Sequence, residues 1–70
     1  MTDLHWREQQ VLEGLAQGLT AEQLGKDLFI GHRTVKTYLK NLYVSLGARN
    51  GPHAVALGFE RGLLKIGERS

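Results

Sequence analysis

Cysteine, long apolar runs and strand-like alternation are all missing from this sequence, and each absence excludes a class of protein. Without thiols the chain forms neither a disulfide framework nor a thiolate metal site, and this composition suits a reducing cytoplasm. No apolar run approaches the roughly 18 residues that a membrane-spanning helix needs, and the first residues lack a secretory signal pattern. We therefore expect a cytoplasmic chain without membrane, metal or cofactor, forming one domain over residues 1–70.

Acidic residues are missing from one stretch, although the net charge of the whole chain is only +2. Residues 31–49 carry four basic side chains and no acidic one, whereas residues 1–30 carry five acids and two bases. This asymmetry indicates a polyanionic partner for the basic stretch. A basic helix face that contacts only solvent gives the same pattern, so charge alone leaves both interpretations open.

The hydrophobic spacing and the glycines divide the chain into four helical segments. Gly18 and Gly47 stand where helix C-terminal caps belong, and Pro52 suits the first position of the last helix. Gly25, inside the second segment, suggests that another helix backbone approaches closely there. The sequence therefore predicts an all-α, four-helix bundle-like domain, with helices at about residues 6–17, 21–28, 32–46 and 52–61.

The second segment begins with the clearest local signal in the chain. Thr20 is a good helix cap, and Gln23 lies three residues later, which is the spacing of a capping box. The same segment ends at the apolar pair Phe29 and Ile30. This pair predicts a tight turn that is packed into the core before the third helix begins.

The third segment carries opposite chemistry on its two faces. At about 100° per residue, an apolar seam faces away from a basic ridge that no acid interrupts. The seam consists of Val35, Leu39, Leu42 and Leu46, and the ridge consists of Arg33, Lys36, Thr37, Lys40 and Val44. A short capped helix, a tight turn and a longer helix make a helix-turn-helix, whose second helix enters the major groove of DNA.

Several of these side chains have a defined chemistry toward DNA. Lysine donates to guanine O6 or N7, and the threonine methyl contacts a thymine methyl. Lys36, Thr37 and Lys40 are therefore candidate base contacts. Arg33, near the start of the helix, and the Thr20 hydroxyl are placed to bind phosphates.

The segment LGKDLFIGHRTVKTYLKNLY, residues 24–43, resembles the helix-turn-helix of the LuxR/GerE family. The similarity continues through LGARN at 46–50, reaches back to LAQGLT at 15–20, and covers roughly residues 4–64. Family members usually carry a further N-terminal domain, so the chain resembles either the stand-alone, GerE-like members or a domain excised from a longer member.

This resemblance implies a four-helix domain that binds DNA in bacterial transcription regulation, usually as a dimer through its last helix. It implies that Lys36, Thr37 and Lys40 face bases, and that Thr34 and Arg49 lie near the DNA backbone. The chain departs from the family pattern without losing the basic ridge. The departures are His5-Trp6 in place of Thr-Pro, Gly31 in place of a capping serine, Tyr38 in place of histidine, and Gly51-Pro52-His53 before the last helix.

Two functions remain in view, and neither is enzymatic. The first is a sequence-specific regulator that binds double-stranded DNA at the nucleoid. The second is a protein-interaction module of the same fold that docks on RNA polymerase or another regulator.

Val55 and Phe59 form a second apolar side of the last helix, which indicates either added core or a homodimer interface. Trp6 is expected to cover the core above the first helix.

Overall fold

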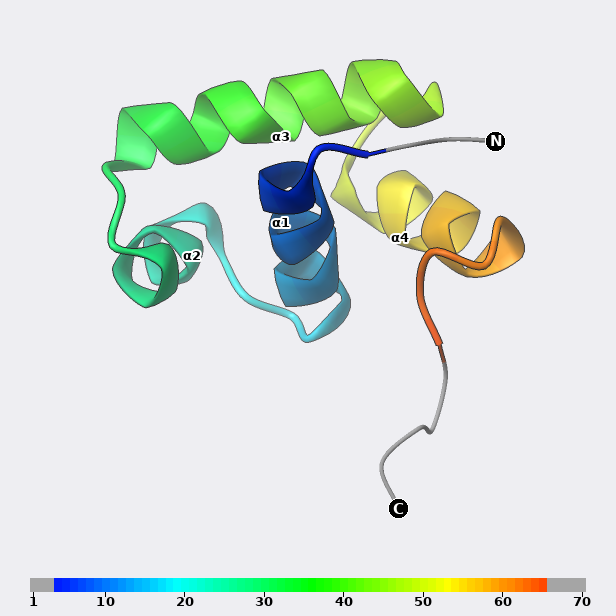
Figure 1. The fold of residues 1–70 in the computed structure, drawn as a ribbon, viewed down its shortest axis with the longest axis horizontal. Coiled ribbons are helices and arrows are strands. Elements are labelled where there is room, and N and C mark those ends of the chain that lie inside the picture. Colours follow the sequence, from blue (N-terminus) through cyan, green and yellow to red (C-terminus); the bar gives the residue numbers. More distant parts are fainter. Residues whose placement is uncertain (1–3, 66–70) are drawn as a thin grey trace.

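The computed structural model describes residues 4–65, and four helices account for most of them (Figure 1). These are α1 (Trp6–Ala16), α2 (Ala21–Leu28), α3 (His32–Leu46) and α4 (Gly51–Glu60), and this part of the chain contains no strand. The all-α prediction is confirmed, and α2 and α3 have the predicted bounds. None of these four helices is both long and apolar enough to cross a membrane.

The first and last helices end one residue away from their predicted bounds. α1 ends at Ala16 and not at residue 17, and Gly18 adopts a left-handed conformation (φ 87°) just beyond it. α4 runs from Gly51 to Glu60 because the side chain of Asn50 caps it. The proline therefore occupies the second helical position, where its missing amide proton is equally harmless.

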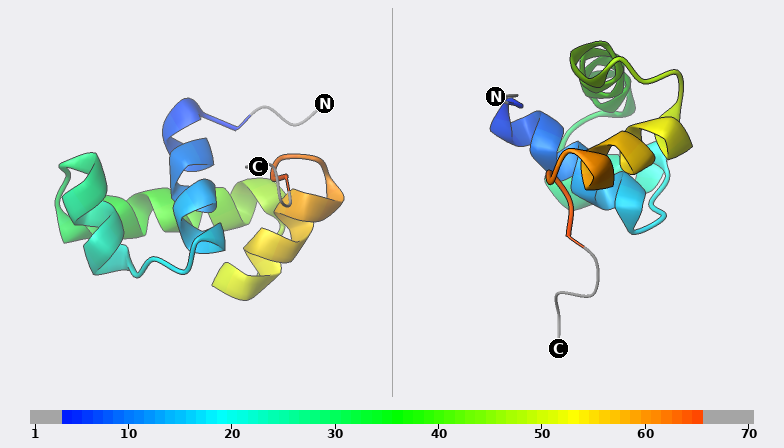
Figure 2. Two further views of the ribbon diagram at one scale, coloured as in Figure 1. Left: turned by 90° about the horizontal axis from the view of Figure 1, so that it is seen from below. Right: turned by 90° about the vertical axis from the view of Figure 1, so that its right-hand side faces the viewer.

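The apolar seam of α3 packs against the other three helices, which all lie on one side of α3 (Figures 1 and 2). Three of the four seam residues are fully buried or nearly so, and Leu39 is half-buried. Each such side chain contributes about 1.5–3 kcal/mol when buried, so the seam fixes which face of α3 turns inward. The core around the seam consists of Val11, Leu12, Leu24, Ala54 and Leu64.

α2 and the following turn pack closely at Gly25, which is buried. A Cβ atom at this position would lie 2.9 Å from the Ile30 carbonyl oxygen and 3.5 Å from a Val35 methyl carbon. The expected close approach is present, but the partner is the backbone of the turn and not another helix. The Ile30 amide also donates to the Gly25 carbonyl at 3.0 Å, so the turn is bonded to the helix it follows.

The expectation that Phe29 packs into the core is wrong. Its side chain is 93% exposed, and its backbone is left-handed with φ 59° and ψ 43°. This conformation brings the Ile30 amide to the Gly25 carbonyl and so ends α2. The geometry of the turn therefore directs the Phe29 ring outward, and Ile30 alone of the pair packs against the core.

We expect Phe29→Asn to stabilise the domain. A left-handed backbone costs a residue with a Cβ atom about 1–2 kcal/mol, and asparagine tolerates it better than phenylalanine. The free energy of unfolding should rise by about 0.5–1 kcal/mol, because the exposed ring contributes little burial. Urea denaturation followed by circular dichroism measures the change, and a lower midpoint would show that contacts of the ring outweigh the strain.

Candidate nucleic-acid interface

The outward face of α3 carries the side chains that are predicted to contact bases. Lys36, Thr37 and Lys40 are all exposed, and α3 contains no acidic residue. The other three helices pack on the opposite side of α3, so no helix covers this face (Figure 2). An uncovered helix of this kind fits the DNA major groove, which is about 12 Å wide and admits one helix.

Thr37 has its hydroxyl group bonded within α3. The hydroxyl donates to the Arg33 carbonyl, one turn earlier, at 3.3 Å. Because this bond occupies the hydroxyl proton, the methyl group is the part of the side chain left for an apolar partner. Among the groups that DNA presents in its major groove, the thymine methyl suits such a side chain.

The first turn of α3 has backbone amides that are not bonded to the protein. Gly31 supplies no side-chain cap, and the first helical bond runs from the Val35 amide to the Gly31 carbonyl at 3.0 Å. The three amides before Val35 therefore face solvent or an anion. Arg33 and Thr34, both predicted phosphate contacts, are exposed in this turn. The turn combines a cation, a hydroxyl and free amides, which are the groups that bind phosphate.

Thr20, exposed at the start of α2, closes the predicted capping box. Its hydroxyl oxygen accepts from the Gln23 amide at 3.2 Å, and its own amide donates to Gln23 Oε1 at 2.9 Å. Because the hydroxyl acts here as an acceptor, its proton remains available to a phosphate. The cap is confirmed, and the phosphate contact stays a prediction.

A shallow groove continues the outward face toward the end of α3. It has a volume of about 470 Å³ and contains the two lysines at one end and the loop after α3 at the other. Its lining residues are Lys36, Leu39, Lys40, Tyr43, Val44, Gly47 and Ala48. Arg49, the remaining predicted backbone contact, follows directly and is exposed. One continuous surface thus joins the predicted base contacts to the loop that carries Arg49.

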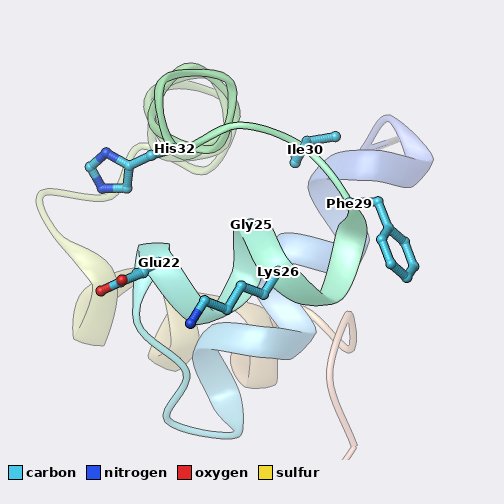
Figure 3. A pocket seen from close by; sticks show the side chains of 6 residues that line it. All are labelled: Glu22, Gly25, Lys26, Phe29, Ile30 and His32. Atoms are coloured by element: carbon cyan, nitrogen blue, oxygen red, sulfur yellow. The ribbon is translucent and has the colours of Figure 1, made fainter.

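A second hollow lies beside the turn and differs in charge (Figure 3). The side chains of Glu22, Lys26 and His32 lie on one side of it, and the Phe29 ring lies on the other. Because the Glu22 carboxylate offsets the Lys26 ammonium, this hollow is a poorer phosphate site than the groove along α3.

Val55 and Phe59 are half-buried in α4, where each packs partly against the core. Part of each side chain remains exposed and available to a partner chain.

The expectation that Trp6 covers the core is wrong, because its side chain projects into solvent from the first turn of α1. The Trp6 ring is 61% exposed, stacks on His5 and lies 4.3 Å from the Arg7 guanidinium carbon.

The sequence does not predict one bond in the loop between α3 and α4. Nδ1 of His53 accepts from the Arg49 amide at 3.0 Å, while the His53 amide donates to Asn50 Oδ1 at 2.9 Å. The sequence contains a signal for this bond, because His53 is the third residue of α4. In a capping box the side chain at this position reaches back to the backbone at the start of the helix. The imidazole therefore holds the backbone of Arg49 in place.

A family model described as bacterial regulatory proteins of the luxR family matches residues 3–57. Among curated relatives, the transcriptional regulatory protein YdfI of Bacillus subtilis is 37% identical over 93% of this chain. The probable transcriptional regulatory protein SgaR of Hyphomicrobium methylovorum is 47% identical over 73% of it.

A solved structure is also similar. The crystal structure of the response regulator ChrA, from a heme-sensing two-component system, matches 91% of this chain with a TM-score of 0.86 and 38% identity. The chain spans 30% of YdfI, 24% of SgaR and 32% of the ChrA chain. The similarity therefore concerns one part of each of these longer proteins.

Proposed function

Because the chain belongs to the LuxR family of bacterial regulatory proteins, we propose that it regulates transcription by binding particular sequences of double-stranded DNA. The observation that carries the proposal is the uncovered face of α3, where Lys36, Thr37 and Lys40 are exposed without an acidic neighbour on the helix. In the proposed complex α3 lies in the major groove and these three side chains contact base edges. The phosphate contacts are Thr20, Arg33, Thr34 and Arg49.

We further propose that the chain binds DNA as a homodimer, at the nucleoid in the bacterial cytoplasm. The exposed parts of Val55 and Phe59 on α4 would form a two-fold symmetric interface. Two α3 helices related in this way would meet half-sites about one helical turn apart on an inverted repeat. Sedimentation of the protein with and without a bound duplex measures the stoichiometry.

Selection from a pool of random duplexes, followed by a salt titration, tests this function. If each subunit of a dimer neutralises about four phosphates, the logarithm of the affinity should fall against the logarithm of the salt concentration with a slope near −7. We expect the recovered duplexes to share a consensus sequence and to bind with such a slope. Failure to enrich any sequence, or an affinity that is indifferent to salt, would contradict the proposal.

Docking on a protein such as RNA polymerase is the second candidate function. The observation that favours it is the exposure of three large apolar side chains, Trp6, Phe29 and Val44. Binding to purified RNA polymerase in the absence of nucleic acid would support it if Lys36→Glu and Lys40→Glu left that binding intact. Binding that requires nucleic acid, and that nuclease treatment removes, would instead indicate DNA as the bridge.

A further inference from the structure

The hydrogen bond at His53 determines which ring nitrogen carries a proton. The Arg49 amide donates to Nδ1 at 3.0 Å, so Nδ1 holds a lone pair. A neutral imidazole with a lone pair on Nδ1 carries its proton on Nε2. The His53 ring therefore presents a hydrogen-bond donor at Nε2 while Nδ1 is occupied by the loop backbone.

The Nε2 donor of His53 is open to solvent. It forms no hydrogen bond within residues 4–65, and no polar side-chain atom in that range is both buried and without a partner. The ring is nevertheless half-buried, and its Nδ1 bond restricts rotation. The donor is thus held in one direction, as a preorganised contact requires.

The segment of the chain that carries His53 favours an anion as the partner of this donor. No acidic residue occurs between Gly31 and Phe59, although the chain contains seven acids elsewhere. The groove that begins at Lys36 ends at Ala48, directly before the exposed Arg49. His53 is therefore bonded to the backbone of the arginine that directly follows this groove and that is predicted to contact the DNA backbone.

We propose that His53 donates its Nε2 proton to a phosphate oxygen of the bound duplex, beside the phosphate that Arg49 contacts. This inference rests on the proposed function. The same ring accepts from the Arg49 amide and donates to DNA, so it couples the conformation of the loop to phosphate binding. Because neutral imidazole adds no charge, the contact positions the duplex without releasing a counterion.

Two substitutions separate the two ring nitrogens. His53→Asn keeps an acceptor near the Nδ1 position and removes the donor at Nε2, whereas His53→Gln places an amide donor near Nε2. The probe is a fluorescein-labelled duplex recovered by the selection described above, and circular dichroism confirms that both variants are folded. At fixed salt we expect His53→Asn to raise Kd about fivefold and His53→Gln to raise it less than about twofold.

The salt dependence distinguishes this contact from a charged one. His53→Asn should leave the slope of log affinity against log salt unchanged, whereas Arg49→Ala should reduce it by about 1 per subunit. Replacing single phosphates of the probe by uncharged methylphosphonates should locate the contact. A methylphosphonate at one position should weaken binding by the wild-type protein, and the same replacement should weaken binding by His53→Asn less. Such a difference indicates that the phosphate and the His53 side chain are coupled.

Measurements on the wild-type protein keep the assignment testable if a variant fails to fold. Long-range ¹⁵N–¹H correlation spectra above neutral pH should show the Nε2-protonated tautomer, and the duplex should slow exchange of that proton. An Nδ1-protonated ring, or His53→Asn binding as tightly as the wild type, would overturn the inference. If the wild-type protein enriches no duplex at all, the proposed function itself fails, which is a different result.

Discussion

Replacing Lys36 and Lys40 together with alanine is expected to remove most of the ability to distinguish one DNA sequence from another. Both side chains project from the uncovered face of α3, one turn apart. Each good lysine contact to a base edge is worth about 1–3 kcal/mol of discrimination. The double variant removes four such contacts from the proposed homodimer. The ratio of its affinities for a selected and a scrambled duplex should therefore be about 1,000-fold smaller than the ratio for the wild type. Fluorescence anisotropy with both duplexes measures the ratio.

Arg33→Ala provides the matched control for the lysine variant. Arg33 lies on the same helix and is also exposed, but it belongs to the first turn, whose free amides suit phosphate. We expect Arg33→Ala to weaken binding to selected and scrambled duplexes by the same factor and to reduce the salt slope by about 1 per subunit. If the lysine variant behaved in this same uniform way, Lys36 and Lys40 would be phosphate contacts and the reading of bases would lie elsewhere.

The exposed face of α3 was predictable because helical periodicity decides it. The four apolar seam residues recur at helical spacing, so burying them turns Lys36 and Lys40 outward without any knowledge of the other helices. The capping box at Thr20 and the left-handed Gly47 were likewise readable, since each depends on neighbours within a few residues. The structure confirms the faces and caps, and the contacts of these side chains with DNA remain predictions.

Other features depended on backbone geometry that hydrophobicity does not report. Phe29 is apolar and was expected inside, but the left-handed turn that ends α2 directs its ring into solvent. Trp6 was expected over the core for the same reason, and its place in the first turn of α1 directs it outward. The place of His53 as the third residue of α4 indicates only that its side chain can reach back, because its bond to the Arg49 amide also depends on the course of the loop and on one side-chain rotamer.

The angle between α2 and α3 depends on the absence of a side chain at Gly25. The Ile30 carbonyl oxygen would lie 2.9 Å from a Cβ atom at this position, and that oxygen belongs to the backbone of the turn. The turn has little freedom to move away, because the Ile30 amide is bonded to the Gly25 carbonyl. A larger residue at this position must therefore either strain the turn or move α3 relative to α2.

Gly25→Val is accordingly expected to destabilise the domain by about 2–3 kcal/mol, because overpacking a close contact costs about 1–3 kcal/mol and valine offers little helix propensity in return. In a domain of this size such a loss lowers Tm by roughly 10 °C or more, which calorimetry measures. Gly31→Ser, at the other end of the turn, is the control. A side chain at Gly31 meets nothing within 4 Å, and serine caps α3, so stability should rise by about 0.3 kcal/mol. Equal Tm values for wild type and Gly25→Val would show that the turn yields to a side chain, and that the glycine does not set the angle between the two helices.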